Sequence, residues 1–185
     1  GMAVHSNGGD TSDGTRVLHT IGHGESSVEE FLARARRAGL ESIVDVRSIP
    51  ASRRHPQFAG TAMDAWLRAA GIDYRWEPDL GGFRRASPES PNTGLHNVSF
   101  RGYADHMASH SFAAALAGVL DEAAERHVAV MCSETLWWRC HRRLIADAAV
   151  LLSGATVLHV DGRGEVQPHR VTPEARREDA ILVYP

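Results

Sequence analysis

Residues 131–143, MCSETLWWRCHRR, contain both cysteines of the chain together with side chains that can act as acid, base or anion ligand. A cysteine thiolate is a nucleophile and a metal ligand. A histidine transfers protons near neutral pH, and an arginine binds carboxylate or phosphate. The segment is therefore open to three interpretations: a metal site, a nucleophile with supporting groups, or a buried strand end followed by an amphipathic helix.

We expect Cys132 to be the more reactive of the two cysteines. It ends the apolar run VAVMC and precedes a turn that leads into a helix. The positive end of a helix and nearby arginines lower the pKa of a thiol and favour the thiolate. We therefore predict catalytic roles for Cys132, Glu134 and His141 and a substrate-binding role for Arg142, although Cys132 could equally be a buried strand-end residue.

Cys140 is expected to be a core residue. A helix over about 138–152 would place Cys140 and Leu144 on its buried face, away from Cys132. A metal site would need both cysteines and His141 to converge, but neighbouring helical residues diverge by about 100°. The spacing therefore predicts no metal site, and nothing in the sequence requires a cofactor.

Alternating strands and helices are expected to position this segment. The expected strands cover residues 17–21, 42–46, 72–76, 128–132 and 155–160. Helical patterns separate them, which predicts an α/β fold of three layers, with a mainly parallel sheet of about five strands and helices on both faces. Residues 17–185 are expected to form a single domain, and residues 1–16 a disordered tail that has too few large apolar side chains to order.

Further polar residues follow the first two strands. His23 follows the first strand, Asp45 ends the second, and Arg47 and Arg53 come after it. Ligands of parallel sheets bind at the carboxyl ends of the strands, where these residues would meet Cys132. We predict catalytic roles for His23 and Asp45 and substrate binding by Arg47 and Arg53. The structural alternatives are a histidine held in a turn, an Asp–Arg ion pair and a solvated arginine.

The composition narrows the class of ligand. The formal net charge of -3 gives no overall attraction to nucleic acid, and all 20 basic residues are arginine. An anion-binding surface must therefore be local. No apolar run approaches the roughly 18 residues of a membrane span, so no membrane partner is expected. Two cysteines are too few for a disulfide framework, which favours a reducing, cytoplasmic location.

Several motifs occur together in one order along the chain. They are TIGHG (20–24), VDVRSIPASRRHPQF (44–58), LGG (80–82), SPNTG (90–94), SFRGYADHM (99–107), MCSETLWWRCHRRLIAD (131–147) and the closing VYP. In this combination the chain, over residues 17–185, resembles the bacterial domain-of-unknown-function 488 family, which is uncharacterised. The resemblance implies a cytoplasmic α/β domain. It also implies that the following motif residues belong together: His23, Asp45, Arg47, Arg53, Cys132, Glu134, Cys140, His141 and Arg142.

Three functions remain open at this stage. The first is an enzyme acting on a phosphate-bearing or other anionic substrate, such as a nucleotide or nucleic acid, in a pocket lined by Arg, His and Cys at the carboxyl edge of the sheet. The second is a non-catalytic nucleic-acid-binding module that uses arginines with Phe100, Tyr103, Trp137 and Trp138. The third is a metal or redox site, the latter with a reversible bond between residues 132 and 140. The oligomeric state is left open.

Overall fold

The structure is a computed structural model, in which residues 16–185 are described. Residues 1–15 of the predicted N-terminal tail lie outside the described residues. Arg16 itself is part of the fold, because its carbonyl oxygen accepts a hydrogen bond of 2.8 Å from the Thr156 N–H.

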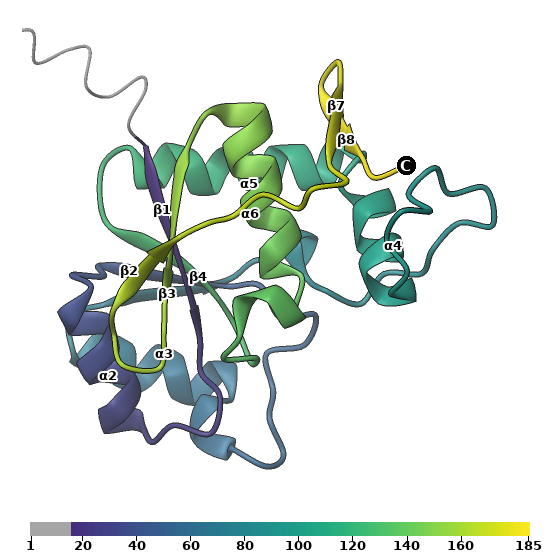
Figure 1. Cartoon of the computed structure of the whole chain (residues 1–185). Helices are drawn as coiled ribbons and strands as arrows, with labels where there is room; N and C mark the ends of the chain where they lie inside the picture. Colours follow the sequence, from purple (N-terminus) through teal and green to yellow (C-terminus); the bar gives the residue numbers. More distant parts are fainter. Residues whose placement is uncertain (1–15) are drawn as a thin grey trace, which may run out of the picture.

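A six-stranded sheet in the order β3-β2-β4-β1-β5-β6 forms the centre of the fold (Figure 1). Its strands are β1 (Val17–Gly22), β2 (Ser42–Asp45), β3 (Asp73–Trp76), β4 (Val128–Cys132), β5 (Thr156–Val160) and β6 (Val166–Pro168). The first five are parallel to one another, and β6 is antiparallel to β5. A separate hairpin pairs β7 (Arg176–Glu178) with β8 (Ile181–Val183). The predicted mainly parallel α/β sheet is confirmed.

Five α-helices accompany the described part of the chain: α2 (Val28–Arg37), α3 (Gly60–Ala69), α4 (Val98–His106), α5 (His110–Ala123) and α6 (Arg142–Ser153). Helices α2 and α3 lie on one side of the sheet, and α5 and α6 lie on the other (Figure 1). Helix α2 begins with a capping box, in which Ser27 and Glu30 each accept a backbone N–H from the other. This arrangement satisfies two N–H groups that a helix start leaves unpaired.

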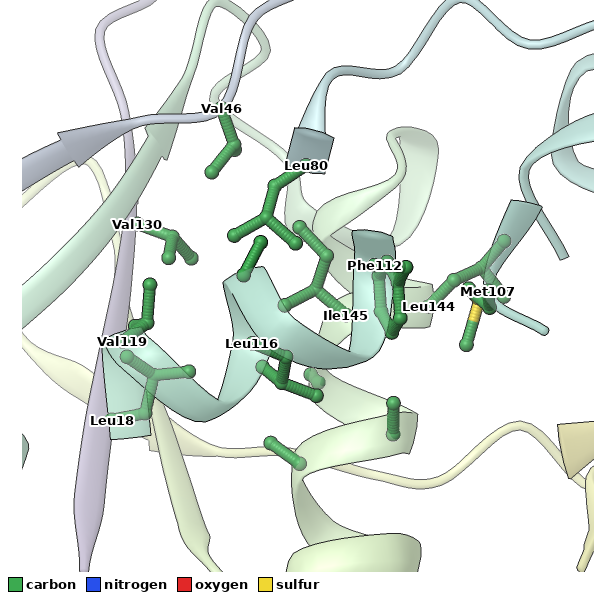
Figure 2. Close-up of a cluster of buried hydrophobic side chains, with 14 of the residues drawn as sticks. Leu18, Val46, Leu80, Met107, Phe112, Leu116, Val119, Val130, Leu144 and Ile145 are labelled. Carbon is green, nitrogen blue, oxygen red and sulfur yellow. The ribbon is translucent and has the colours of Figure 1, made fainter. Parts of the chain in front are cut away.

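The apolar run of β4 is continuous because both faces of the strand are covered. Val128 and Val130 belong to the hydrophobic cluster on the α5–α6 side, whereas Ala129 and Met131 belong to the cluster on the α2–α3 side. Side chains of a strand alternate between the two faces of a sheet, so a strand buried on both faces needs apolar residues at every position. Figure 2 shows Val130 among the side chains of the α5–α6 cluster.

The helix predicted over about 138–152 begins later than expected. Trp137–Arg139 form a short 3-10 helix, Cys140 has extended backbone angles (φ -135, ψ 174), and α6 begins at Arg142. The Trp137 ring stacks on His159, with ring centroids 4.2 Å apart. Trp137 and His159 are far apart in the sequence, so the spacing of apolar residues near Trp137 does not predict this contact. The helical register that assigned Cys140 to the buried face of a helix is therefore wrong.

The register of the sheet brings the predicted polar segments together at its carboxyl edge. Gly22 pairs with Cys132, and Asp45 pairs with Met131. The His23 N–H then donates to the Cys132 carbonyl over 3.0 Å. A Cβ at Gly22 would overlap the backbone carbonyl of Glu134, so only glycine permits this close approach.

Candidate active site

The two cysteines meet at the end of β4. The Sγ atoms of Cys132 and Cys140 lie 3.3 Å apart, and both residues are free thiols. Cys132 is buried, whereas Cys140 is partly exposed. The extended backbone at Cys140 turns its side chain back toward the strand end. Thus two thiols that the sequence pattern separates form one chemical unit.

Arg142 lies directly behind this pair and is fully buried. Its Nε–H donates to Cys132 Sγ over 3.0 Å, and its Nη1–H donates to Thr20 Oγ1 over 2.9 Å. Its Nη2 group donates to the backbone carbonyls of Glu134 and Thr135. All three guanidinium nitrogens therefore contact protein atoms, which leaves a fixed positive charge against the thiols.

The buried guanidinium favours a negative charge on the pair. Burial opposes ionisation of Cys140, but the hydrogen bond from the Cys132 thiol and the charge of Arg142 outweigh it and lower the pKa of Cys140 to about 6. Burial raises the pKa of Cys132 well above its ordinary value. One negative charge is thus shared by two sulfurs, and it reaches solvent at Cys140, the less buried of the two. A thiolate is the nucleophilic form of cysteine.

A cavity of about 210 Å³ opens over the thiols. It is lined by Arg47, Ser48, Gly82, Phe83, Ser99, Phe100, Cys132, Ser133, Glu134, Arg139, Cys140 and His141. Four of the predicted site residues are among them: Arg47, Cys132, Glu134 and His141. Ser48, Phe83 and Ser99 were not expected in this site from the sequence, because they lie in loops or at a helix start that only the fold brings together.

His141 presents one ring nitrogen as an acceptor. Its Nε2 lies 2.7 Å from the Val46 carbonyl oxygen, which can only accept, so Nε2 carries the hydrogen. Burial lowers the pKa of His141 to about 4, so the ring is neutral near pH 7 and Nδ1 holds a lone pair. Gly82 lies against this nitrogen: a Cβ there would come within 2.7 Å of Nδ1.

Asp45 and Arg47 form a buried ion pair beside the cavity. Arg47 Nη2 lies 2.7 Å from Asp45 Oδ2, and Tyr74 donates its hydroxyl hydrogen to the same oxygen over 2.6 Å. Asp45 does not line the cavity, but Arg47 does. Its Nη1 is buried and has no hydrogen-bond partner among the described residues. The structure thus brings Arg47 to the cavity and places Asp45 behind it.

His23 and Arg53 lie on the other side of the segment 133–134, in a second and wider cavity of about 710 Å³. Arg53 is exposed. The His23 Nδ1–H donates to the Gly24 carbonyl over 2.7 Å, and its ring stacks on Phe58 with centroids 4.3 Å apart. Burial lowers the pKa of His23 to about 4. Six of the predicted site residues are therefore divided between two cavities that share Ser133 and Glu134 as a common wall, whereas Asp45 and Arg142 line neither.

The structure also bears on the alternative sites. Tyr103 is fully buried and Trp137 is 9% exposed, so neither ring is free to stack a base. Trp138 is 46% exposed, and Phe100 lines the cavity. Within residues 16–185, no group of three or more His, Cys, Asp or Glu side chains is arranged to hold a metal ion. No helix in that range is long and apolar enough to cross a membrane.

The fold and this site define a three-layer α/β protein with a paired-thiol cavity at the carboxyl edge of its parallel sheet. The chain belongs to the family described as domain of unknown function DUF488, which matches residues 27–149. The resemblance inferred from the motifs is thereby confirmed. The matched range includes both cysteines, and the motif TIGHG and the closing VYP lie outside it. No curated protein and no solved structure matches the chain.

Proposed function

We propose that this protein is a thiol-dependent enzyme that acts on a phosphate-bearing or other anionic substrate. The observation that carries the proposal is the pair of sulfur atoms 3.3 Å apart that lines a cavity, with the buried Arg142 guanidinium donating to Cys132 Sγ behind it. A fixed cation next to a thiol lowers its pKa and increases the thiolate fraction at neutral pH. Burying an arginine this way is costly unless its charge is compensated, and a shared thiolate supplies that compensation.

Cys140 is the proposed nucleophile, and Cys132 is the thiol that stabilises it. Cys140 is the more exposed sulfur and has the lowered pKa. Arg142 is fully buried and does not line the cavity, and each of its nitrogens donates to a protein atom, so it is not in reach of a substrate. Its role is therefore to stabilise the thiolate, in place of the substrate-binding role expected from the sequence.

Arg47 and Arg139 are the proposed anion ligands. Both line the cavity above the thiols, and Arg139 is exposed. Asp45 fixes Arg47 through a two-point contact and leaves its Nη1 without a partner among the described residues. A guanidinium held in this way binds phosphate or carboxylate oxygens without losing further side-chain entropy.

His141 is the proposed base. In the reaction with a phosphate ester, the Cys140 thiolate forms an S–P bond while the P–O bond to the leaving group breaks; the leaving oxygen keeps the bonding electrons and takes a proton from solvent. A water molecule then attacks phosphorus, its proton passes to His141 Nδ1, and the S–P bond breaks to return the thiolate. The hydrogen bond from Nε2 to Val46 fixes the tautomer that this step needs. The wider cavity, with His23 and Arg53, would hold the remainder of a larger substrate such as a nucleotide.

The proposal is tested by p-nitrophenyl phosphate hydrolysis and by intact-protein mass spectrometry after rapid acid quenching. We expect turnover in the wild-type protein, none in Cys140→Ser, and an accumulated phosphoryl adduct in His141→Gln. Ser42→Ala is the matched control, because its hydroxyl contacts Glu122 at the opposite edge of the sheet. Inorganic phosphate should also slow alkylation of Cys140 in a saturable way, and Arg47→Ala should weaken that protection. Absence of turnover, adduct and protection together would refute the proposal.

A dithiol redox function is the second candidate, and the 3.3 Å sulfur separation favours it. A peroxide would oxidise the Cys140 thiolate to a sulfenic acid, and the Cys132 thiol would displace water to form the disulfide. Thiol titration after treatment with one equivalent of peroxide distinguishes the candidates. Loss of both thiols, reversed by dithiothreitol, supports the redox function, whereas retention of both thiols excludes it.

A further inference from the structure

A chain of buried polar side chains runs from the thiol pair into the core. Thr20 Oγ1, which accepts from Arg142, lies 2.6 Å from His159 Nδ1. His159 Nε2 lies 2.9 Å from His169 Nδ1, and His169 Nε2 lies 2.7 Å from Asp147 Oδ1. We call these four residues the Asp147 network: Thr20, His159, His169 and Asp147.

The positions of the hydrogens in this network follow from the groups at its two ends. Arginine can only donate, so Thr20 accepts from Arg142. A neutral His159 ring that donates from Nε2 accepts at Nδ1, which directs the Thr20 hydroxyl hydrogen to His159. His159 then donates to His169, which donates to Asp147. In this arrangement each link has one donor and one acceptor, and all donors are directed toward Asp147.

Asp147 is held as the terminal acceptor of the network. It is fully buried, and it also accepts the Tyr184 hydroxyl hydrogen over 2.8 Å and the Thr172 N–H over 3.0 Å. The Trp137 ring covers His159 in a parallel stack. Burial and the neighbouring His169 and Arg142 lower the pKa of His159, which keeps its ring neutral as this arrangement requires. The network is therefore shielded from water along its length.

We propose that the Asp147 network is a positioning device that holds the Arg142 guanidinium against Cys132 and thereby sets the reactivity of the thiol pair. The inference rests on the proposed function, because it concerns the same nucleophile. Arginine does not release its proton at physiological pH, so the network acts by orientation and polarisation and does not conduct protons. His159, His169 and Asp147 touch neither cavity and are positioning residues.

Thr20→Val and Thr20→Ser form the matched pair that tests the network. Valine has nearly the shape of threonine but leaves Arg142 Nη1 and His159 Nδ1 without their shared partner, whereas serine keeps the hydroxyl. The readout is the rate of Cys140 alkylation by iodoacetamide between pH 5 and pH 9. We expect Thr20→Val to raise the pKa of Cys140, which moves the rate profile to higher pH and lowers the rate at pH 6 by about threefold to tenfold. At pH values below the pKa, a rise of one unit in the pKa lowers the thiolate fraction by about tenfold. Thr20→Ser and Ser42→Ala should retain the wild-type profile.

Other charges near the thiols remain in place in both Thr20 variants. Besides Arg142, the charged and titratable groups around the cavity are Arg47, Glu134, Arg139 and His141. A shift confined to Thr20→Val therefore reports the loss of the network. A folded Thr20→Val protein with the wild-type profile would overturn the inference.

A second measurement on the wild-type protein covers the case in which Thr20→Val fails to fold. Nitrogen-15 NMR should find hydrogen on Nε2 and none on Nδ1 in both His159 and His169. The His159 signals should also shift when the thiol pair titrates near pH 6, although the pKa of His159 itself is depressed. A hydrogen on His159 Nδ1, or signals that ignore the thiol titration, would overturn the inference. Neither measurement uses a substrate, so loss of p-nitrophenyl phosphate turnover alone bears only on the proposed function.

Discussion

Cys132 Sγ and Cys140 Sγ lie 3.3 Å apart, and Arg142 donates to the first of them from a fully buried position. The arrangement gives the two sulfurs different properties. Cys132 is shielded and holds its proton, while Cys140 faces the cavity and carries the charge. A single buried cation thus favours the thiolate at one of two neighbouring cysteines.

Alkylation is expected to distinguish the two cysteines. Because the pKa of Cys140 is lowered to about 6, Cys140 should react with iodoacetamide at a nearly full rate at pH 7, while Cys132 should react slowly until well above pH 9. Cys132→Ala removes the thiol that donates to Cys140 and should raise the midpoint of the Cys140 profile. Peptide mapping by mass spectrometry measures both rates. Modification of Cys132 ahead of Cys140 would contradict this assignment.

Gly82→Ala is expected to impair the site. The new Cβ would lie 2.7 Å from His141 Nδ1, and His141 is held by Val46 and packs against Tyr103 with ring centroids 5.0 Å apart. Displacement of the ring should slow hydrolysis at least tenfold and destabilise the fold by about 1–3 kcal/mol, as overpacking usually does.

Gly118→Ala is the control for this substitution. A Cβ at Gly118 meets no atom within 4 Å, and the residue lies inside helix α5. Alanine is favoured over glycine in a helix by about 0.5–1 kcal/mol, so this variant should be at least as stable as the wild type and fully active. Equal activity in Gly82→Ala and Gly118→Ala would contradict the prediction, because it would show that displacement of His141 does not affect hydrolysis.

Asp45→Asn is expected to destabilise the protein strongly. The side chains of Asp45 and Arg47 are 0% and 7% exposed, and breaking a buried ion pair by removing one charge costs about 3–5 kcal/mol. Tyr74→Phe removes only one hydrogen bond to Asp45 and should cost about 1 kcal/mol. Urea unfolding measures both losses. Similar losses in the two variants would mean that the charge of Asp45 is unimportant for the fold.

Stability is expected to fall as the pH decreases from about 7 to 5. Burial lowers the pKa of His23 and of His141 to about 4, below the ordinary value of 6.5. Between these values the unfolded chain binds more protons than the folded chain, so the free energy of unfolding decreases as the pH falls, by up to about 1.4 kcal/mol per pH unit for each histidine.

His141→Gln tests the histidine contribution to this pH dependence. Glutamine keeps a donor for the Val46 carbonyl but does not titrate, so the variant should lose less stability than the wild type between pH 7 and pH 5. Urea titrations at pH 7, 6 and 5 give the comparison. An identical pH dependence in the two proteins would exclude His141 as a source.

The order of elements and the edge of the sheet that carries the site were predictable from local sequence. A strand covered on both faces must be apolar at every position, as in VAVMC, and parallel strands bring the residues after them to one edge. This reasoning placed Cys132, Glu134, His141 and Arg47 at one edge of the sheet, where all four line one cavity. The sequence could not show that His23 and Arg53 line a second cavity, because the path of the segment 133–134 between the two cavities depends on the tertiary structure.

Only the tertiary structure determined how the two thiols are related. Helical periodicity assigned Cys140 to a core face, but α6 begins at Arg142, and Cys140 lies in an extended segment that returns to Cys132. Trp137 stacking on His159 and Arg142 binding to the carbonyls of Glu134 and Thr135 hold this segment. These partners are distant in sequence or depend on a folded core. Residue types and spacing therefore determined which groups are available for chemistry, and long-range packing determined which of them act together.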